Sequence, residues 1–121
     1  MGRRNELRDR FTLALDFAAR QLRHLVTAYP DCFPTYTTNG KWQHAGGLWV
    51  NWCEGFLPGQ LWLVHRHTGD PWFREKAEHY CRLIEQRKED RTIHDLGFMF
   101  WPSWKRWYDL TGDARIRNVV A

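Results

Sequence analysis

The sequence has no long apolar run and few cysteines. Nowhere in its 121 residues is there a stretch close to the roughly 18–20 uninterrupted apolar residues of a membrane-spanning helix. The start, residues 1–11, carries basic residues without the apolar run of a secretory signal. The three cysteines, Cys32, Cys53 and Cys81, are odd in number and widely spaced, which argues against a disulfide framework and for a reducing compartment. We therefore expect a cytoplasmic protein without a membrane partner.

Patterns typical of metal and nucleic-acid binding are also missing. There is no C-x-x-C, no H-E-x-x-H and no paired Cys/His knuckle, and His65 and His67 are two residues apart, so they do not share a helix face. These absences predict that there is no metal site. The 18 basic and 14 acidic side chains give a net charge of +4. Because the basic residues are scattered rather than clustered, no nucleic-acid partner is expected.

Aromatic residues are abundant. Eight Trp, seven Phe and four Tyr make up 16% of a chain whose charged and hydrophobic fractions, 26% and 43%, are close to the globular average. That average excludes the disordered and fibrous classes. Large rings bury much surface in a core, and they also line ligand clefts, so composition leaves both uses open.

The first part of the chain is predicted to be a helix followed by an irregular stretch. Within residues 5–29, apolar side chains recur at steps of three and four, which is typical of one helix face. Pro30 ends that helix. Residues 30–47 are irregular, and Asn39-Gly40 is a turn signal that joins two short extended pieces. The apolar helix positions are Leu7, Phe11, Ala14, Ala18, Leu22, Leu25 and Tyr29.

The rest of the chain is predicted to form helical hairpins. Helices are predicted over residues 56–68 and 71–89, separated by a T-G-D-P sequence in which Gly69 stops one helix and Asp70 caps the next. T-G-D returns 43 residues later at positions 111–113. A helix–turn–helix unit repeated every ~40 residues is typical of α-solenoids or α/α toroids. The last predicted helix has only about two turns, and so short a helix is marginally stable. Either it docks on a neighbouring molecule or the chain is a fragment of a longer protein, and we favour the fragment.

Three segments stand out for their side chains: residues 48–59, 92–100 and 101–107. The first two each lead into the first helix of a hairpin, so we expect Trp52 and the pair His94-Asp95 to lie near each other in a cleft. An aromatic ring beside a carboxylate suits sugar binding, because the C–H face of a sugar stacks on the ring while polar groups bind the hydroxyls. A carboxyl held in apolar surroundings can also donate a proton near neutral pH, and Asp95 has apolar neighbours in sequence.

Each candidate has a structural alternative. An Asp before a helical G-F-M-F run can simply be an N-cap, and this reading of Asp95 stays open on the sequence. Trp52 can be a core ring between hairpins. His94 can be a hydrogen-bonded structural histidine.

The motifs resemble the N-terminal part of glycoside hydrolase family 88, the unsaturated glucuronyl hydrolases. The resemblance rests on the order and spacing of residues 52–63 (WCEGFLPGQLWL), 68–70 (TGD) and 94–100 (HDLGFMF), and it runs from about residue 33 to residue 121. It implies an (α/α)6 barrel. Six hairpins at the observed period need more than twice this chain, so residues 1–121 are expected to be the N-terminal fragment of one barrel domain, cut after about two hairpins.

The resemblance also implies an activity. The family acts on lyase-generated oligosaccharides that end in an unsaturated uronic acid, hydrates its C4=C5 bond, and releases that sugar, with no metal or organic cofactor. By motif, Asp95 matches one of two catalytic aspartates, and His94 and Trp52 match substrate-contacting positions. The second aspartate is expected beyond residue 121, and Cys53 stands where Thr is expected. We therefore expect this fragment alone to be inactive, and to self-associate through exposed barrel faces.

Two other functions stay open. One is a related α/α-barrel enzyme such as an unsaturated rhamnogalacturonyl hydrolase, although the H-D-L-G-F motif argues against it. The other is a helical-repeat module that binds sugar or protein without turnover. The preferred uronate, whether from chondroitin, hyaluronan, heparin or a bacterial gum, is also open.

Overall fold

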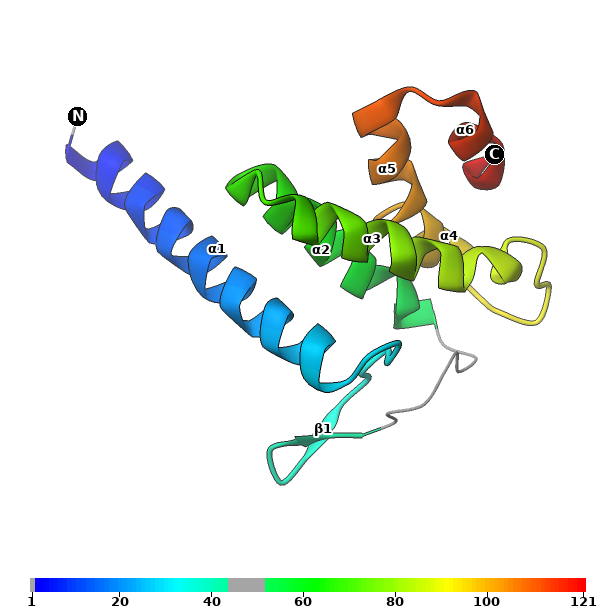
Figure 1. Cartoon of the computed structure of the whole chain (residues 1–121), viewed down its shortest axis with the longest axis horizontal. Coiled ribbons are helices and arrows are strands. Elements are labelled where there is room, and N and C mark those ends of the chain that lie inside the picture. Colours follow the sequence, from blue (N-terminus) through cyan, green and yellow to red (C-terminus); the bar gives the residue numbers. More distant parts are fainter. Residues whose placement is uncertain (1, 44–51) are drawn as a thin grey trace.

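The structure is a computed structural model that describes residues 2–43 and 52–121. It is mostly helical (Figure 1), in agreement with the predicted all-α class. In chain order its elements are α1 (Gly2–Ala28), β1 (Thr37–Thr38), β2 (Lys41–Trp42), the 3-10 helix η1 (Trp52–Gly55), α2 (Phe56–Thr68), α3 (Pro71–Ile84), the 3-10 helix η2 (Glu85–Arg87), α4 (Leu96–Phe100), α5 (Trp104–Thr111) and α6 (Ala114–Val120). Among the described residues, no helix is long and apolar enough to span a membrane.

The turn between α2 and α3 follows the predicted capping pattern. Gly69 adopts a left-handed conformation with φ 69°, and its N–H donates to the carbonyl of His65 at 2.8 Å. Asp70 then caps α3, because its carboxylate accepts the backbone N–H of Trp72 at 2.9 Å. Pro71 occupies the first turn of the helix, where a missing N–H costs nothing. The three signals together reverse the chain and confirm the predicted hairpin.

The second T-G-D builds the same turn between α5 and α6. Gly112 has φ 65°, and the Asp113 carboxylate accepts the backbone N–H of Arg115 at 2.8 Å. The hairpin repeat is therefore confirmed in geometry as well as in sequence. Closure of such hairpins into an (α/α)6 ring stays a prediction.

One predicted boundary is wrong. The helix expected over residues 71–89 ends at Ile84 and continues as the 3-10 turn η2. The charged residues from Glu85 onward bury no apolar face, so packing does not favour a further α-helical turn, and 3-10 geometry is common at such ends.

The core lies where α2, α3 and α5 meet. Its buried members are Leu22, Val26, Phe33, Leu57, Leu61, Trp62, Val64, Phe73, Ala77, Tyr80, Cys81, Ile84, Met99, Phe100, Trp104, Trp107 and Ile116. Cys81 is at its centre: the indole N–H of Trp62 donates to its sulfur at 3.4 Å, and that of Trp104 donates to its carbonyl at 2.8 Å. Burial raises the pKa of the Cys81 thiol to about 12.

Helix α1 is only half packed. Its C-terminal half contributes Leu22 and Val26 to the core, and the Arg23 guanidinium donates to Asp70 at 2.5 Å. The N-terminal half projects from the body (Figure 1), and Leu7 and Phe11 are exposed. The apolar face predicted for residues 5–29 is therefore present, but no described helix covers its first half.

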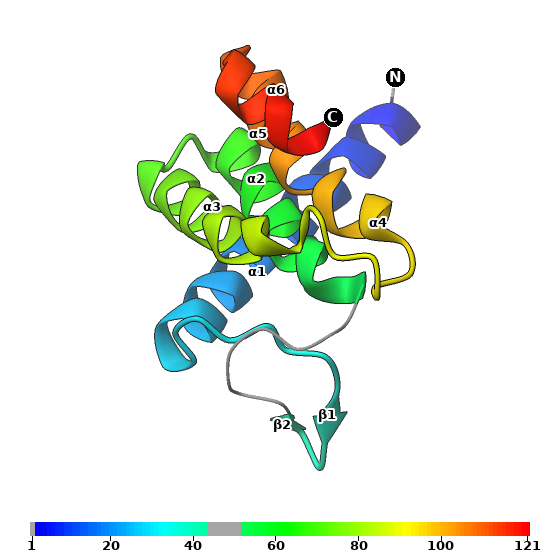
Figure 2. The same cartoon turned by 90° about the vertical axis from the view of Figure 1, so that its right-hand side faces the viewer.

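The predicted turn at Asn39-Gly40 is confirmed. It joins β1 and β2 in an antiparallel pair, with Thr37 opposite Trp42, and this hairpin extends away from the helices (Figure 2). Asn39 and Gly40 both have positive φ, 49° and 72°, as the favoured two-residue hairpin turn requires. Residues 44–51, which include the end of the predicted irregular stretch and the start of the first motif, lie outside the described residues.

Candidate functional site

The first two motifs lie against each other through glycine. Helix α4, from the second motif, packs beside η1, from the first (Figure 2). A Cβ placed on Gly55 would lie 2.1 Å from the carbonyl oxygen of Met99, and one on Gly59 would lie 2.9 Å from that of Pro102. Both glycines of W-x-x-G-F-x-x-G are therefore needed for close backbone approach to the segment around the second motif. The elements that carry the two motifs therefore meet, and a shared cleft for Trp52 and the pair His94-Asp95 stays a prediction.

Three rings join the motifs at the surface. Trp52 and Phe56, from the first motif, and Phe98, from the second, form what we call the aromatic cluster. The Trp52 ring centroid lies 5.5 Å from that of Phe98 and 6.0 Å from that of Phe56. Trp52 is 45% exposed, Phe56 40% and Phe98 50%. In this chain Trp52 is therefore a surface ring and not a core ring: it contacts Phe56 edge-on and Phe98 at a tilt, and nearly half of its surface is exposed.

Asp95 precedes α4 in an unusual conformation. It stands at the N-cap position, but with φ 63° and ψ 42° and without a side-chain cap hydrogen bond. A capping side chain normally extends from a β-region backbone, so the N-cap interpretation is wrong for the carboxylate. Asp and Asn adopt left-handed backbone more readily than other residues with a side chain, and Asp31 and Asn39 do so here as well. Asp95 is exposed, so the expected apolar surroundings are not observed among the described residues.

His94 is exposed as well, next to Asp95 in sequence. Its ring makes no hydrogen bond to any described residue, so the structure of residues 2–43 and 52–121 does not support the role of a hydrogen-bonded structural histidine. Trp52 packs on Phe98, three residues after Asp95. The structure therefore brings η1, which carries Trp52, next to α4, which His94 and Asp95 directly precede.

Sequence reasoning missed a buried acid beside this site. Glu54 lies in η1, between Trp52 and Phe56, and is only 4% exposed. Its neighbour Cys53 is partly buried; burial raises the pKa of that thiol, and the charge of Glu54 raises it further. Hydropathy gives no signal for a buried glutamate, and the only available hint is its position inside the first motif.

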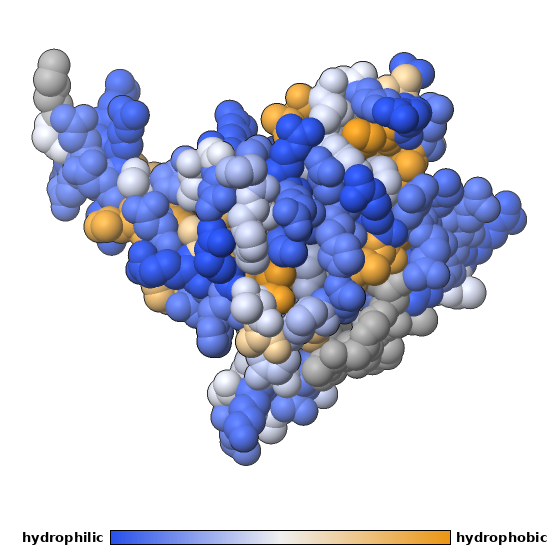
Figure 3. Space-filling model, in the orientation of Figure 1, coloured by the Kyte–Doolittle hydropathy of each residue, from blue (hydrophilic) through white to orange (hydrophobic). Residues whose placement is uncertain are grey.

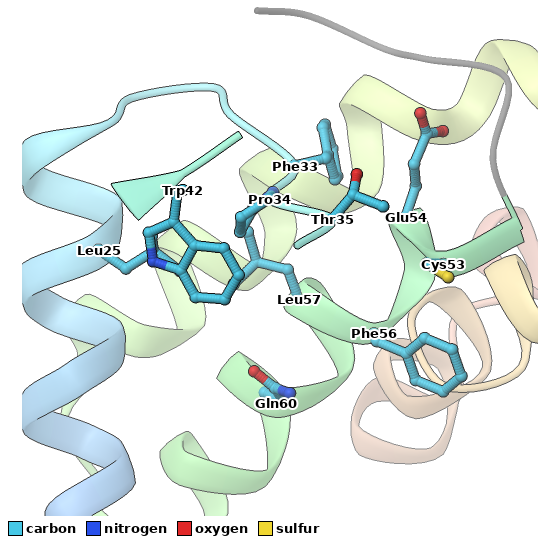
Figure 4. A pocket seen from close by; sticks show the side chains of 10 residues that line it. All are labelled: Leu25, Phe33, Pro34, Thr35, Trp42, Cys53, Glu54, Phe56, Leu57 and Gln60. Atoms are coloured by element: carbon cyan, nitrogen blue, oxygen red, sulfur yellow. The ribbon is translucent and has the colours of Figure 1, made fainter. Parts of the chain in front are cut away.

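Glu54 borders a cavity of about 340 Å³. Figure 4 shows Trp42 and Gln60 on one side of this pocket and Glu54 with Phe33 on another, while the Phe56 ring points away from Trp42. Phe56 thus belongs both to the pocket lining and to the aromatic cluster. Within residues 2–43 and 52–121, no group of three or more His, Cys, Asp or Glu side chains is arranged to hold a metal ion.

Two of the three comparisons with known proteins find relatives. No family model matches the sequence. The chain is 43% identical over 54 residues to an unsaturated glucuronyl hydrolase of Formosa agariphila, a match that covers 45% of this chain and 14% of that enzyme. It is 32% identical over 101 residues to an unsaturated chondroitin disaccharide hydrolase of Streptococcus pyogenes, covering 78% of this chain and 25% of that protein.

A solved structure extends the likeness to the fold. The unsaturated glucuronyl hydrolase from Streptococcus agalactiae matches with a TM-score of 0.69 and 26% identity, over 88% of this chain and 29% of that one. This chain is homologous to the unsaturated glucuronyl hydrolases. The homology confirms the resemblance carried by residues 52–63, 68–70 and 94–100. It is partial in extent, because the chain spans between 14% and 28% of the length of the curated relatives that it matches.

Proposed function

We propose that this chain is the N-terminal part of a hydrolase that releases an unsaturated uronic acid from the non-reducing end of lyase-generated oligosaccharides. The observation that carries the proposal is the contact between Trp52 and Phe98, at a ring separation of 5.5 Å. It joins the two motifs, and both the Trp52 indole and Asp95, three residues before Phe98, are exposed. The relatives, named as unsaturated glucuronyl and unsaturated chondroitin disaccharide hydrolases, support the same assignment.

The reaction is a hydration. A proton adds to C4 of the unsaturated sugar and a water oxygen adds to C5, so C5 becomes a hemiketal carbon. The ring then opens to a ketone at C5 and leaves a hemiacetal at C1. Collapse of that hemiacetal to an aldehyde breaks the glycosidic bond and releases the rest of the oligosaccharide. This needs one proton donor and one base that takes the proton of the water. We assign Asp95 to one of these two carboxyl groups. We assign Trp52 to stacking against the sugar ring, and His94 to hydrogen bonding with its polar groups.

The second carboxyl group is assigned to residues outside positions 1–121. The matched enzymes are more than three times as long as the part that this chain covers. On this proposal, the 121-residue chain binds the unsaturated sugar but does not turn it over.

The uncovered face of α1 fits the same proposal. A groove of about 700 Å³ lies between α1, the β-hairpin and α2, and Figure 3 shows apolar side chains at the surface of the projecting end of α1. Phe17 and Leu63, on its two walls, are both exposed. We propose that further hairpins of an (α/α)6 ring cover this groove. In the isolated chain it is expected to cause self-association, because contiguous exposed apolar surface favours burial between molecules.

The test combines binding and turnover. An unsaturated chondroitin disaccharide is mixed with the chain, and its binding is followed by ligand-observed NMR and its conjugated C=C by ultraviolet absorbance. We expect binding without loss of absorbance. A chimera in which residues 1–121 replace the matching part of the Streptococcus agalactiae enzyme is expected to remove the absorbance.

The matched variants are Asp95→Asn and Asp9→Asn, of which the latter changes an exposed aspartate on α1 far from the aromatic cluster. Asp95→Asn should abolish turnover by the chimera, and Asp9→Asn should leave it unchanged. Full activity of the Asp95→Asn chimera would remove Asp95 from the chemistry. Binding without turnover by an otherwise folded chimera would favour a sugar-binding module instead.

A further inference from the structure

Trp101 lies at the surface and is not part of the hydrophobic core. It is 62% exposed, compared with 45% for Trp52, and it follows directly after α4. The three tryptophans Trp62, Trp104 and Trp107 are buried in the core. Trp101 is therefore a large apolar side chain whose exposure is not explained by packing within the described residues.

Its position continues the aromatic cluster. Trp101 keeps helical backbone angles, φ −66° and ψ −47°, and its N–H donates to the carbonyl of Gly97 at 2.9 Å. Side chains three residues apart on a helix share a face, so Trp101 is the neighbour of Phe98 along α4. Phe98 contacts Trp52, so Trp101 extends the aromatic cluster by one further position along the chain. We call Phe56, Trp52, Phe98 and Trp101 together the aromatic strip.

Polar residues lie next to two members of this strip, Trp101 and Phe98. The ammonium of Lys105 lies 5.1 Å from the centroid of the Trp101 ring and pairs with the carboxylate of Asp109. A cation over the face of an indole is attracted to the ring, and more than half of the Trp101 surface stays exposed beside it. His94 and Asp95 lie four and three residues before Phe98, directly ahead of α4. Exposed rings bordered by hydrogen-bonding groups suit a sugar chain, whose C–H faces stack while its hydroxyls bind the polar rim.

We propose that Trp101 stacks against a further sugar ring of the same oligosaccharide, so that it determines the preference for ligand length. The proposal rests on the proposed function, because it takes the uronic acid to lie at Trp52. Lys105 acts as a positioning residue: it fixes the indole from one face, while the sugar occupies the other.

The test compares ligand lengths on the 121-residue chain. Affinities for an unsaturated chondroitin disaccharide and for the corresponding tetrasaccharide are measured by calorimetry or ligand-observed NMR. The wild type is expected to bind the tetrasaccharide more tightly, by about tenfold, the order of magnitude that ring stacking supplies. Trp101→Ala should remove this difference and leave the disaccharide affinity nearly unchanged. Trp101→Phe should restore part of it.

Two matched variants separate this proposal from the proposed function. Phe11→Ala removes a 61% exposed ring from the projecting half of α1, and should change neither affinity. Trp52→Ala should weaken both ligands equally, since it removes the site of the uronic acid. Loss of binding in Trp52→Ala with an unchanged length preference in Trp101→Ala would overturn only the role of Trp101.

The remaining outcomes are equally decisive. A length preference that depends on Trp101 while Trp52→Ala has no effect would support the second ring site and overturn the assignment of Trp52. No binding of either oligosaccharide to the folded wild type would overturn both proposals. Thermal unfolding of each variant, followed by circular dichroism, establishes that the chain is folded, and exposed side chains such as Trp101 are expected to be replaceable without loss of the fold.

Discussion

Replacing Gly55 with alanine is the sharpest test of how the two motifs are joined. The added Cβ would lie 2.1 Å from the Met99 carbonyl oxygen, well inside the 3.4 Å at which ordinary van der Waals contact begins. The obstacle is backbone rather than a flexible side chain, so η1 and α4 must separate. Overpacking of this kind costs about 3 kcal/mol. For a chain of this size we expect the unfolding midpoint to fall by about 10 °C.

Gly97→Ala is the matched control. Gly97 lies inside α4, and nothing within 4 Å would meet its Cβ. Alanine is the better helix former by about 0.5–1 kcal/mol, so this variant should melt at the wild-type temperature or slightly above it. Circular dichroism at increasing temperature measures both variants. If Gly55→Ala melted within a degree or two of Gly97→Ala, the contact between η1 and α4 would not have the geometry described here.

Three further outcomes are expected. The backbone N–H of Trp72, assisted by Arg23, lowers the pKa of the Asp70 carboxyl. A carboxyl with a lowered native pKa adds stability at pH values above its unfolded pKa of about 4, and this stability is lost as the pH falls through the native pKa. The free energy of unfolding of Asp70→Asn should therefore fall less steeply at acid pH than that of the wild type. Cys81, whose pKa is raised to about 12 by burial, should resist alkylation at pH 8 in the folded chain and react after denaturation, as read by mass spectrometry. Phe11→Asp should reduce self-association in sedimentation velocity experiments without lowering the unfolding midpoint, because the Phe11 side chain is exposed in the single chain.

Features governed by neighbouring residues could be predicted from the sequence. The turn at Gly69 and Asp70 depends on one left-handed glycine and one capping carboxylate, and the hairpin at Asn39-Gly40 depends on two positive φ angles. Each is determined within a few residues, so a local rule is sufficient. The homology to the unsaturated glucuronyl hydrolases could likewise be recognised from motif order.

Features governed by distant contacts could not be predicted. Periodicity shows that α1 has an apolar face but not what covers it, and Phe11 proves to be exposed. The Asp95 side chain does not cap α4, because the backbone there is left-handed. No local sequence pattern predicts that conformation. The burial of Glu54 depends on how η1 packs, which hydropathy does not report. Aromatic content was compatible with both a core ring and a surface ring at Trp52, and only the tertiary contact with Phe98 decides between them.

The half-packed state of α1 implies that one continuous helix has two very different local stabilities. Amide hydrogens exchange with solvent through local opening, at a rate set by the free energy of that opening. Around Leu22 and Val26, opening requires core contacts to break, whereas around Leu7 it disrupts only the helix itself. Protection should therefore rise along α1 from its first turn toward residue 28. Any partner or further segment that covers the exposed half would remove this gradient, so the exchange profile of a single helix reports whether that surface is occupied.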